Sequence, residues 1–198
     1  MKALVPLFAI SLATSGAMAG NSLIVENAAV AVAKSGLTVR PDREWNKLGA
    51  RPGRNSETWT IDGDTLNDLT FYGGIEDGKT LFREVDRHNK PLPRFSATML
   101  LTDIPSLVEN SYRIALGTSL MTIDKVEPAR LGSRNGIRFE YSFVRQGEDL
   151  HRRGEGYATT QGGKLYMITF EAPALYYFDA DVGAARQVVA SVTLPKSS

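Results

Sequence analysis

The side chains that most often perform covalent chemistry are scarce in this sequence. It contains no cysteine, and its only imidazoles are those of His88 and His151. Neither histidine has a carboxylate or a second histidine nearby at the spacing typical of metal ligands. No serine stands in a Gly-x-Ser-x-Gly or Ser-x-x-Lys pattern, where nucleophilic serines are commonly found. We therefore expect no catalytic residue, no bound metal and no cofactor.

Acidic side chains are the remaining candidates for acid–base chemistry. The pairs that stand close in sequence are Glu57 with Asp62, Glu76 with Asp77, and Asp179 with Asp181. A glycosidase needs two carboxylates that face one cleft, about 5–9 Å apart. Turns and helix caps explain most of these residues, so a carboxylate-based hydrolase is an alternative hypothesis.

The segment DGDTLND places Asp62, Asp64 and Asp68 at a spacing that resembles a calcium-binding loop. Such a loop also requires a glycine at its sixth position and a bidentate glutamate at its twelfth. This chain has Asn67 and Gly73 at those positions. A hairpin turn with a capping aspartate is therefore favoured over a calcium site.

Two groups of arginines could form an anion-binding patch. They are Arg51 with Arg54 in a loop, and Arg152 with Arg153 at the start of a strand. Exposed ion pairs would explain these arginines without any ligand, and the candidate partners are Glu140, Glu148 and Glu155. Ion pairing is the favoured interpretation, and a calcium- or anion-dependent binding module is a further alternative.

The glycine pair in Tyr72-Gly73-Gly74 follows an expected strand, as in loops that bind phosphate. The residues after it, Glu76 and Asp77, are acidic and would repel a phosphate. A Gly-Lys-Ser/Thr signature is also missing. The sequence therefore predicts a turn at the glycine pair.

Residues 73–94 are the least regular part of the chain, rich in Gly, Asp, Arg, Lys and Pro. Loops longer than about 12–15 residues are uncommon unless they are functional or flexible. We expect an exposed excursion attached to the domain by Leu81, Phe82 and Val85.

Aromatic side chains such as Trp45 and the run Tyr176-Tyr177-Phe178 could line a pocket. The candidate residues for binding a ligand or a partner are Tyr72, Phe82, Arg83, His88, Tyr176 and Tyr177.

The first 19 residues have the pattern of a secretory signal peptide: Lys2, an apolar run, and Ala17-Met18-Ala19 before the cleavage site. No second apolar stretch approaches the length of about 20 residues that a spanning helix needs. Lys and Arg total 23 against 22 Asp and Glu, so no excess charge indicates nucleic acid as a partner. We expect an exported protein, periplasmic or secreted, from a bacterium.

The mature chain is predicted to contain a lead-in segment at 20–36 and a single domain at 37–195. Period-two alternation predicts strands at 58–61, 66–72 and from 122 onward, with a hairpin turn at Gln161-Gly162-Gly163. Residues 164–171 are apolar on both faces, which is typical of a central strand. Helices are predicted from Asp103 to Gly117 and after a cap at Asp179 or Asp181. The pattern predicts an α+β fold in which helices cover a meander of about five to seven antiparallel strands.

The order of these features is informative. A short strand at 37–40 runs into Pro41 and Trp45, a helix follows the first strands, and a long meander comes next. The chain then ends with Glu171-Ala172-Pro173, an aromatic run and a last helix. Over roughly residues 37–194 this order resembles the PsbP-like superfamily, which includes DcrB-type bacterial envelope proteins.

The resemblance implies an α/β/α sandwich and a non-enzymatic role in binding, assembly or adsorption. It implies no catalytic residues, because the superfamily shares none. This sequence departs from the superfamily in its 73–94 excursion and in the absence of a lipobox cysteine. The main hypothesis is therefore an exported accessory protein of the cell envelope that binds another envelope protein or a small ligand.

Overall fold

A computed structural model describes residues 20–118 and 120–196 of the chain. The predicted signal peptide, residues 1–19, lies outside these residues. Eight antiparallel strands form one sheet in the order β1-β4-β5-β6-β10-β9-β8-β7. The strands are β1 (Ser22–Ile24), β4 (Trp45–Lys47), β5 (Ser56–Thr60), β6 (Asp68–Ile75), β7 (Leu120–Leu131), β8 (Arg134–Val144), β9 (His151–Gln161) and β10 (Lys164–Pro173). The expected antiparallel meander is confirmed from β7 to β10.

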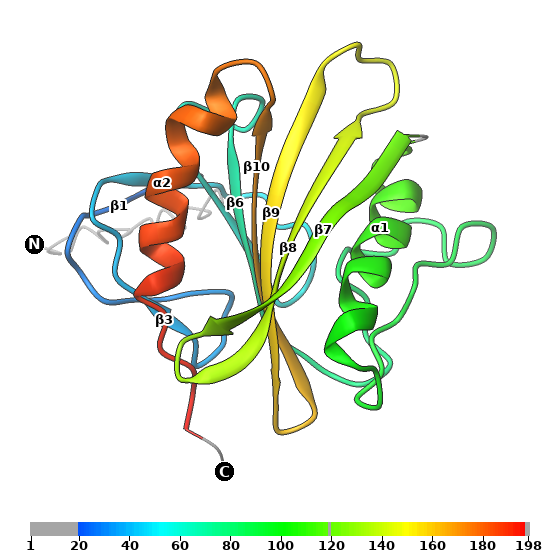
Figure 1. The fold of residues 1–198 in the computed structure, drawn as a ribbon, viewed down its shortest axis with the longest axis horizontal. Coiled ribbons are helices and arrows are strands. Elements are labelled where there is room, and N and C mark those ends of the chain that lie inside the picture. Colours follow the sequence, from blue (N-terminus) through cyan, green and yellow to red (C-terminus); the bar gives the residue numbers. More distant parts are fainter. Residues whose placement is uncertain (1–19, 119, 197–198) are drawn as a thin grey trace, which may run out of the picture.

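Two helices lie on opposite sides of this sheet (Figure 1). Helix α1 (Ile104–Ala115) follows a single 3-10 turn, Leu101–Asp103, and α2 (Tyr177–Ala190) follows β10. A separate two-stranded ribbon pairs β2 (Val30–Ala31) with β3 (Thr38–Val39). The structure is thus mostly antiparallel sheet with two helices, as the α+β prediction required.

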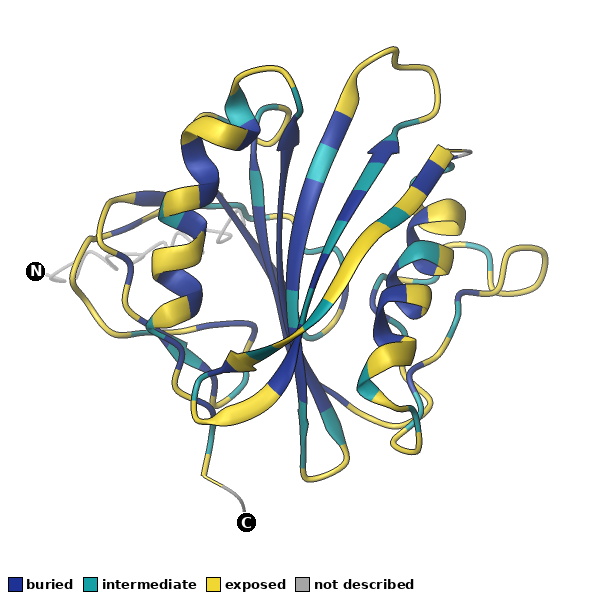
Figure 2. Cartoon of the chain, in the orientation of Figure 1, coloured by how far each residue is buried: buried dark blue, intermediate teal, exposed yellow. Residues whose placement is uncertain are grey.

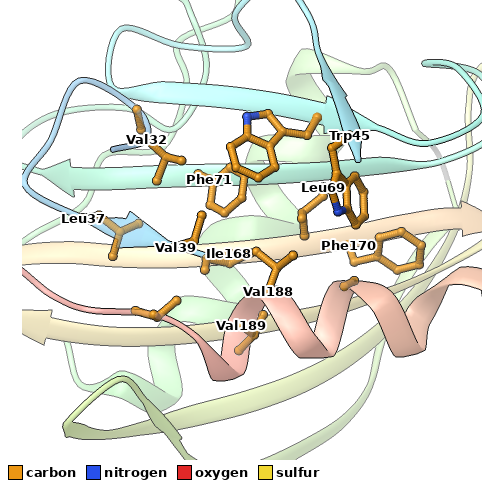
Figure 3. Close-up of a cluster of buried hydrophobic side chains, with 14 of the residues drawn as sticks. Val32, Leu37, Val39, Trp45, Leu69, Phe71, Ile168, Phe170, Val188 and Val189 are labelled. Carbon is orange, nitrogen blue, oxygen red and sulfur yellow. The ribbon is translucent and has the colours of Figure 1, made fainter. Parts of the chain in front are cut away.

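Each face of the sheet has its own hydrophobic core. On the α2 side, Phe71 and Ile168 from the central strands pack with Val188 of the helix (Figure 3). On the α1 side, Met167 and Phe139 pack with Val108. Strand β10 supplies buried side chains to both cores, which confirms its predicted central position.

Several local predictions were wrong for reasons of tertiary packing. Trp45 was considered as a residue that could line a pocket, but it begins β4 and is almost fully buried in the α2-side core. The pair Gly73-Gly74 lies inside β6 rather than in a turn, beside an irregularity in the β6–β10 register. A Cβ on Gly73 would approach the Ser35 side chain to 2.3 Å, so the close contact with the lead-in segment requires glycine there.

The predicted starts of the helices also differ in part from those in the structure. Helix α1 spans the predicted residues, but the Asp103 carboxylate accepts a hydrogen bond from the Leu100 backbone N–H and therefore caps the preceding 3-10 turn. Helix α2 begins at Tyr177, before either predicted aspartate cap. The apolar stripe of α2, which includes Val182 and Val189, is buried.

The irregular excursion begins later than predicted, after β6 ends at Ile75, and it runs to the turn before α1. Figure 2 shows it as a largely exposed segment, in agreement with the prediction. Leu81 is buried and Phe82 is half-buried, so these two residues attach it to the domain. Val85 is 96% exposed, so the prediction that it anchors the excursion was wrong.

Glycine in β9 allows two aromatic rings of β8 to lie flat on the sheet. A Cβ on Gly156 would approach the Phe139 ring to 2.2 Å, and this ring is fully buried. Replacing Gly156 with alanine should therefore destabilise the protein by about 1–3 kcal/mol, because a packed core has no space for the displaced ring. Denaturant unfolding measures this change.

Gly183 provides the matched control for that variant. It lies exposed in α2, and a Cβ there would meet no atom within 4 Å. Gly183→Ala should stabilise the protein by about 0.5–1 kcal/mol through helix propensity. Equal and small effects of the two substitutions would contradict the close packing of Phe139 on Gly156.

Candidate functional site

The α1-side face of the sheet is apolar beneath helix α1 and polar beyond the end of the helix. Alternate residues of a strand lie on one face, so Asp68 and Thr70 continue the row of Tyr72, while Glu171 continues the row of Met167. Helix α1 ends at Ala115, and Gly117 follows with a positive φ of 64° that turns the chain away. The uncovered end of this face is therefore polar.

A cavity of about 340 Å³ lies over this polar end of the sheet. Its floor includes Asp68, Thr70, Tyr72 and Glu171. Its walls are formed by Phe82 of the excursion, by Tyr112 and Leu116 at the end of α1, by Arg145 and by the loop at 48–52. The volume is at the lower end of the range for small-molecule sites.

Two carboxylates on the floor of the cavity, Asp68 and Glu171, are bridged by the guanidinium group of Arg145. Asp68 and Glu171 are direct neighbours on β6 and β10. Nη2 of Arg145 lies 3.1 Å from Oε1 of Glu171 and 3.5 Å from Oδ2 of Asp68. Oε2 of Glu171 also accepts hydrogen bonds from the hydroxyls of Tyr112, at 2.8 Å, and Tyr141, at 3.3 Å.

Burial next to a second carboxylate changes the protonation of Asp68. Desolvation, then the charge of Glu171, raises the pKa of Asp68 from 3.8 to about 7, against the opposing effect of Arg145 and Arg152. The pKa values of the Tyr112 and Tyr141 hydroxyls are also raised, by burial and by the charge of Glu171. Asp68 can thus gain or lose a proton near neutral pH.

Several buried polar atoms around the cavity have no hydrogen-bond partner in the protein. Three of them, Oδ1 of Asp68, Nε of Arg145 and Nη1 of Arg51, belong to residues that line the cavity, while Nε and Nη1 of Arg152 belong to a residue outside its lining. The Arg152 side chain is only 2% exposed and donates from Nη2 to the Thr65 carbonyl at 2.8 Å. Each unpaired buried group costs about 1–3 kcal/mol, so a cluster of them indicates a site that receives further polar partners.

The structure brings together only part of the predicted binding set. Tyr72 and Phe82 both line the cavity, with ring centroids 6.3 Å apart in an edge-to-face contact. Arg83 lies outside it and lines a separate groove of the excursion. His88 is exposed in the same excursion.

The predicted aromatic run before α2 is elsewhere and is divided. Tyr176 is 72% exposed, with a positive φ of 75°, while Phe178 is buried in the α2-side core. Tyr177 is half-buried and packs against that core. This run therefore forms an exposed tyrosine at a helix start and does not line the cavity.

Sequence reasoning missed the charged residues of the cavity. It placed Asp68 in a hypothetical calcium loop, and it did not consider Arg145, Tyr112 or Glu171 as site residues. A signal was present, because Glu171 ends a run of apolar residues and a charged residue is rarely buried without a specific partner. Arg152 was expected on a solvated face, but it is buried.

The other predicted charge clusters have structural roles. Asn67 joins Asp62 and Asp181 by donating from Nδ2 to both, at 2.8 and 3.0 Å. Oδ1 of Asn67 accepts from the Ile61 backbone N–H at 2.7 Å, so an asparagine organises the turn that was expected to have a capping aspartate. Within residues 20–118 and 120–196, no group of three or more His, Cys, Asp or Glu is arranged to hold a metal ion.

Glu57, Asp179, Arg51 and Arg153 from the other predicted carboxylate and arginine groups also form ion pairs. Glu57 accepts from Nε1 of Trp59 at 2.9 Å and pairs with Lys47 at 3.0 Å. Arg51 approaches the same carboxylate at 3.8 Å. Arg153 pairs with Asp179 at 2.9 Å, a partner that the sequence reasoning had not proposed.

Comparison with known proteins gives one informative similarity, to a solved structure. The solution structure of cyanobacterial PsbP (CyanoP) from Synechocystis sp. PCC 6803 matches with a TM-score of 0.54 and 17% identity, covering 94% of this chain and 99% of that one. The chain therefore has a PsbP-like fold, which confirms the resemblance predicted from the order of its elements. At this identity the similarity shows the fold alone.

Other matches are weaker. A protein from Bacteroides thetaiotaomicron VPI-5482 has a TM-score of 0.48 and 11% identity, covering 90% of this chain and 50% of that one. LpqN, involved in cell envelope biogenesis of Mycobacterium tuberculosis, has a TM-score of 0.29 and 11% identity, with coverage of 90% and 87%. No protein-family model and no curated protein sequence matches this chain. Among the described residues, no helix is long and apolar enough to cross a membrane.

Proposed function

We propose that this chain is an exported, non-enzymatic accessory protein of the bacterial cell envelope, a PsbP-like α/β/α sandwich that binds a small polar ligand in the cavity over β6 and β10. The proposed export to the periplasm rests on the signal-peptide pattern of residues 1–19. The observation that carries the proposed binding role is the group of buried polar atoms without a hydrogen-bond partner on Asp68, Arg145 and Arg51, all of which line the cavity.

The charges and hydrogen-bonding groups of these residues indicate which chemical groups the ligand carries. When Asp68 is ionised, the two carboxylates Asp68 and Glu171 balance the two guanidinium groups of Arg145 and Arg152, so the cluster then favours a ligand without net charge. Oδ1 of Asp68 requires a donor when ionised, while Nε of Arg145 and Nη1 of Arg152 require acceptors. A compact molecule with several hydroxyls, or a zwitterion, supplies both the donor for Asp68 and the acceptors for the arginines.

Binding tests this proposal directly. The folded protein should be heated with monosaccharides, disaccharides and amino acids, and a ligand that binds the native state should raise its melting temperature. Asp68→Ala should weaken binding of that ligand on the order of tenfold or more, because a buried acceptor in the site is lost. Isothermal titration gives the affinity.

Asp181→Ala is the matched control. Asp181 is a buried aspartate with a raised pKa, as Asp68 is, but its carboxylate bonds to Asn67 and it does not line the cavity. This variant should change stability and leave ligand affinity unchanged. Equal loss of binding in both variants, or no stabilising ligand for a protein isolated in folded form, would argue against the cavity as the binding site.

A second function, carboxylate-based hydrolysis, is favoured by one specific observation. Asp68 has a pKa of about 7 and stands next to Glu171, and a general acid works best with a pKa near the operating pH. The two functions differ in their products: a binding protein releases its ligand unchanged, while a hydrolase converts it. Turnover of chromogenic glycosides that Asp68→Asn abolishes would establish the second function in place of the first.

A further inference from the structure

A second hollow lies on the excursion that follows β6. Its volume is about 670 Å³, and its lining includes the cations Arg54, Lys79, Arg83, Arg87 and Arg94. Only two carboxylates, Glu76 and Glu84, line it. The whole chain carries a formal net charge of +1, so positive charge is concentrated at this groove.

Both carboxylates of the groove are already paired. Glu84 accepts from Nη2 of Arg94 at 2.9 and 2.8 Å, and Glu76 accepts from Nζ of Lys164 at 2.9 Å. Within the described ranges, Arg54, Lys79, Arg83 and Arg87 form no ion pair with a carboxylate. Four exposed cations therefore face one hollow without a direct ion pair, and of these Lys79 and Arg54 interact at longer range with the charge of Glu76.

The segment that carries these cations is held in place by cross-links. Thr80 bridges to Arg94, and the Phe95 backbone N–H donates to the Lys79 carbonyl at 2.8 Å. The Arg83 backbone N–H donates to the Pro52 carbonyl at 2.7 Å, which ties the excursion to the loop that carries Arg54. Cations from two loops are thus kept together, although their mutual repulsion would separate them in a free segment.

We propose that this groove binds the phosphate groups of an anionic ligand. Three of its four unpaired cations are arginines, whose planar guanidinium groups bind phosphate oxygens with two parallel hydrogen bonds. The hollow is large enough for more than one phosphate group. It shares only the ring of Phe82 with the polar cavity, so the two sites can be tested separately.

The test uses the mature chain with two phosphate probes. Pyrophosphate titrated at low ionic strength measures binding of a free phosphate compound. Flotation with phosphatidylcholine vesicles, with and without phosphatidylglycerol, measures binding of a lipid headgroup. Arg83→Gln and Arg87→Gln should each weaken binding of the preferred probe on the order of tenfold, and the double variant should weaken it further. Added salt should weaken binding of the unchanged protein as well.

Lys90→Gln is the control, because Lys90 is an exposed cation of the same excursion that does not line the groove. It should leave affinity unchanged, and all four variants should melt at the temperature of the parent. Binding of pyrophosphate alone, or of phosphatidylglycerol vesicles alone, would identify the source of the phosphate. Binding of neither probe, binding of polyglutamate but not of phosphate, or equal losses in Lys90→Gln would overturn the proposal. Loss of sugar or amino-acid binding in Asp68→Ala does not affect these results.

Discussion

Replacing Asp68 with asparagine should stabilise this protein at pH 8 by up to about 4 kcal/mol, since the rise of its pKa from 3.8 to about 7 corresponds to a free energy of that size. The cause is burial next to Glu171, which penalises the charged form of Asp68. Asparagine has nearly the same shape and carries no charge. For a chain of this size, the stabilisation corresponds to a rise in melting temperature of roughly 8–16 °C.

The direction of the pH dependence follows from the same shift. In the unfolded chain Asp68 loses its proton at about pH 4, while in the folded protein it keeps the proton up to about pH 7. Between these values the folded state binds more protons, so the stabilising contribution of Asp68 is full below about pH 4 and is lost as the pH rises through 7. Asp68→Asn should remove this dependence.

Denaturant unfolding of both proteins from pH 4 to pH 8 provides the measurement. Asp124→Asn is the control, because Asp124 is exposed on β7 and its replacement should have little effect at any pH. If Asp68→Asn is no more stable than the parent at pH 8, then Arg145 and Arg152 compensate the charge fully. The charged groups of the cavity would then neutralise one another, and the cluster would have a structural role.

Replacing Glu155 with glutamine should have the opposite effect and destabilise the protein by about 3 kcal/mol at neutral pH, since the pKa of this carboxyl is lowered from 4.5 to about 2. Its side chain is 2% exposed. It accepts hydrogen bonds from Nε and Nη2 of Arg186 at 3.0 and 2.6 Å, from the Tyr157 hydroxyl at 2.6 Å, and from Arg138. These donors outweigh the cost of its burial, and a neutral amide cannot replace the lost charge.

For Glu155 the stabilising contribution is present above about pH 4.5 and is lost as the pH falls through about 2, because the unfolded state then binds the extra proton first. Glu140→Gln is the matched control. Glu140 pairs with the same Arg138 group at 2.8 Å, but its side chain is 33% exposed. It should cost less than about 1 kcal/mol, and equal losses at both positions would show that burial of Glu155 adds nothing.

Much of the fold was readable from local patterns. Alternation in β8 and the apolar run of β10 depend only on which side chains must be buried, so their spacing predicted the strands directly. The Asp103-Ile104-Pro105 start of α1 and the glycines of the β9–β10 turn have steric causes within a few residues. Helix α1 and strand β10 were therefore predicted almost at their true bounds.

The wrong predictions concern residues whose conformation is determined by contacts with residues distant in sequence. Gly73 lies in a strand rather than in a turn because it pairs with Tyr166 of β10, and Ser35 packs against it where a Cβ would stand. The sequence gives no indication of either contact. Trp45 belongs to a strand of only three residues, which exists because β5 and β1 lie on either side of it. A strand this short contains too few residues to show a period.

The sequence alone determined that the chain has no thiol, only two imidazoles, a signal-peptide pattern and a sheet covered by helices, because composition and periodicity are local properties. Only the tertiary structure decided which charges meet. Asp68, Arg145 and Glu171 are far apart in the chain, and they form one cluster because β6 and β10 are neighbours in the sheet and α1 ends before covering them. The cavity and its protonation arise from that arrangement.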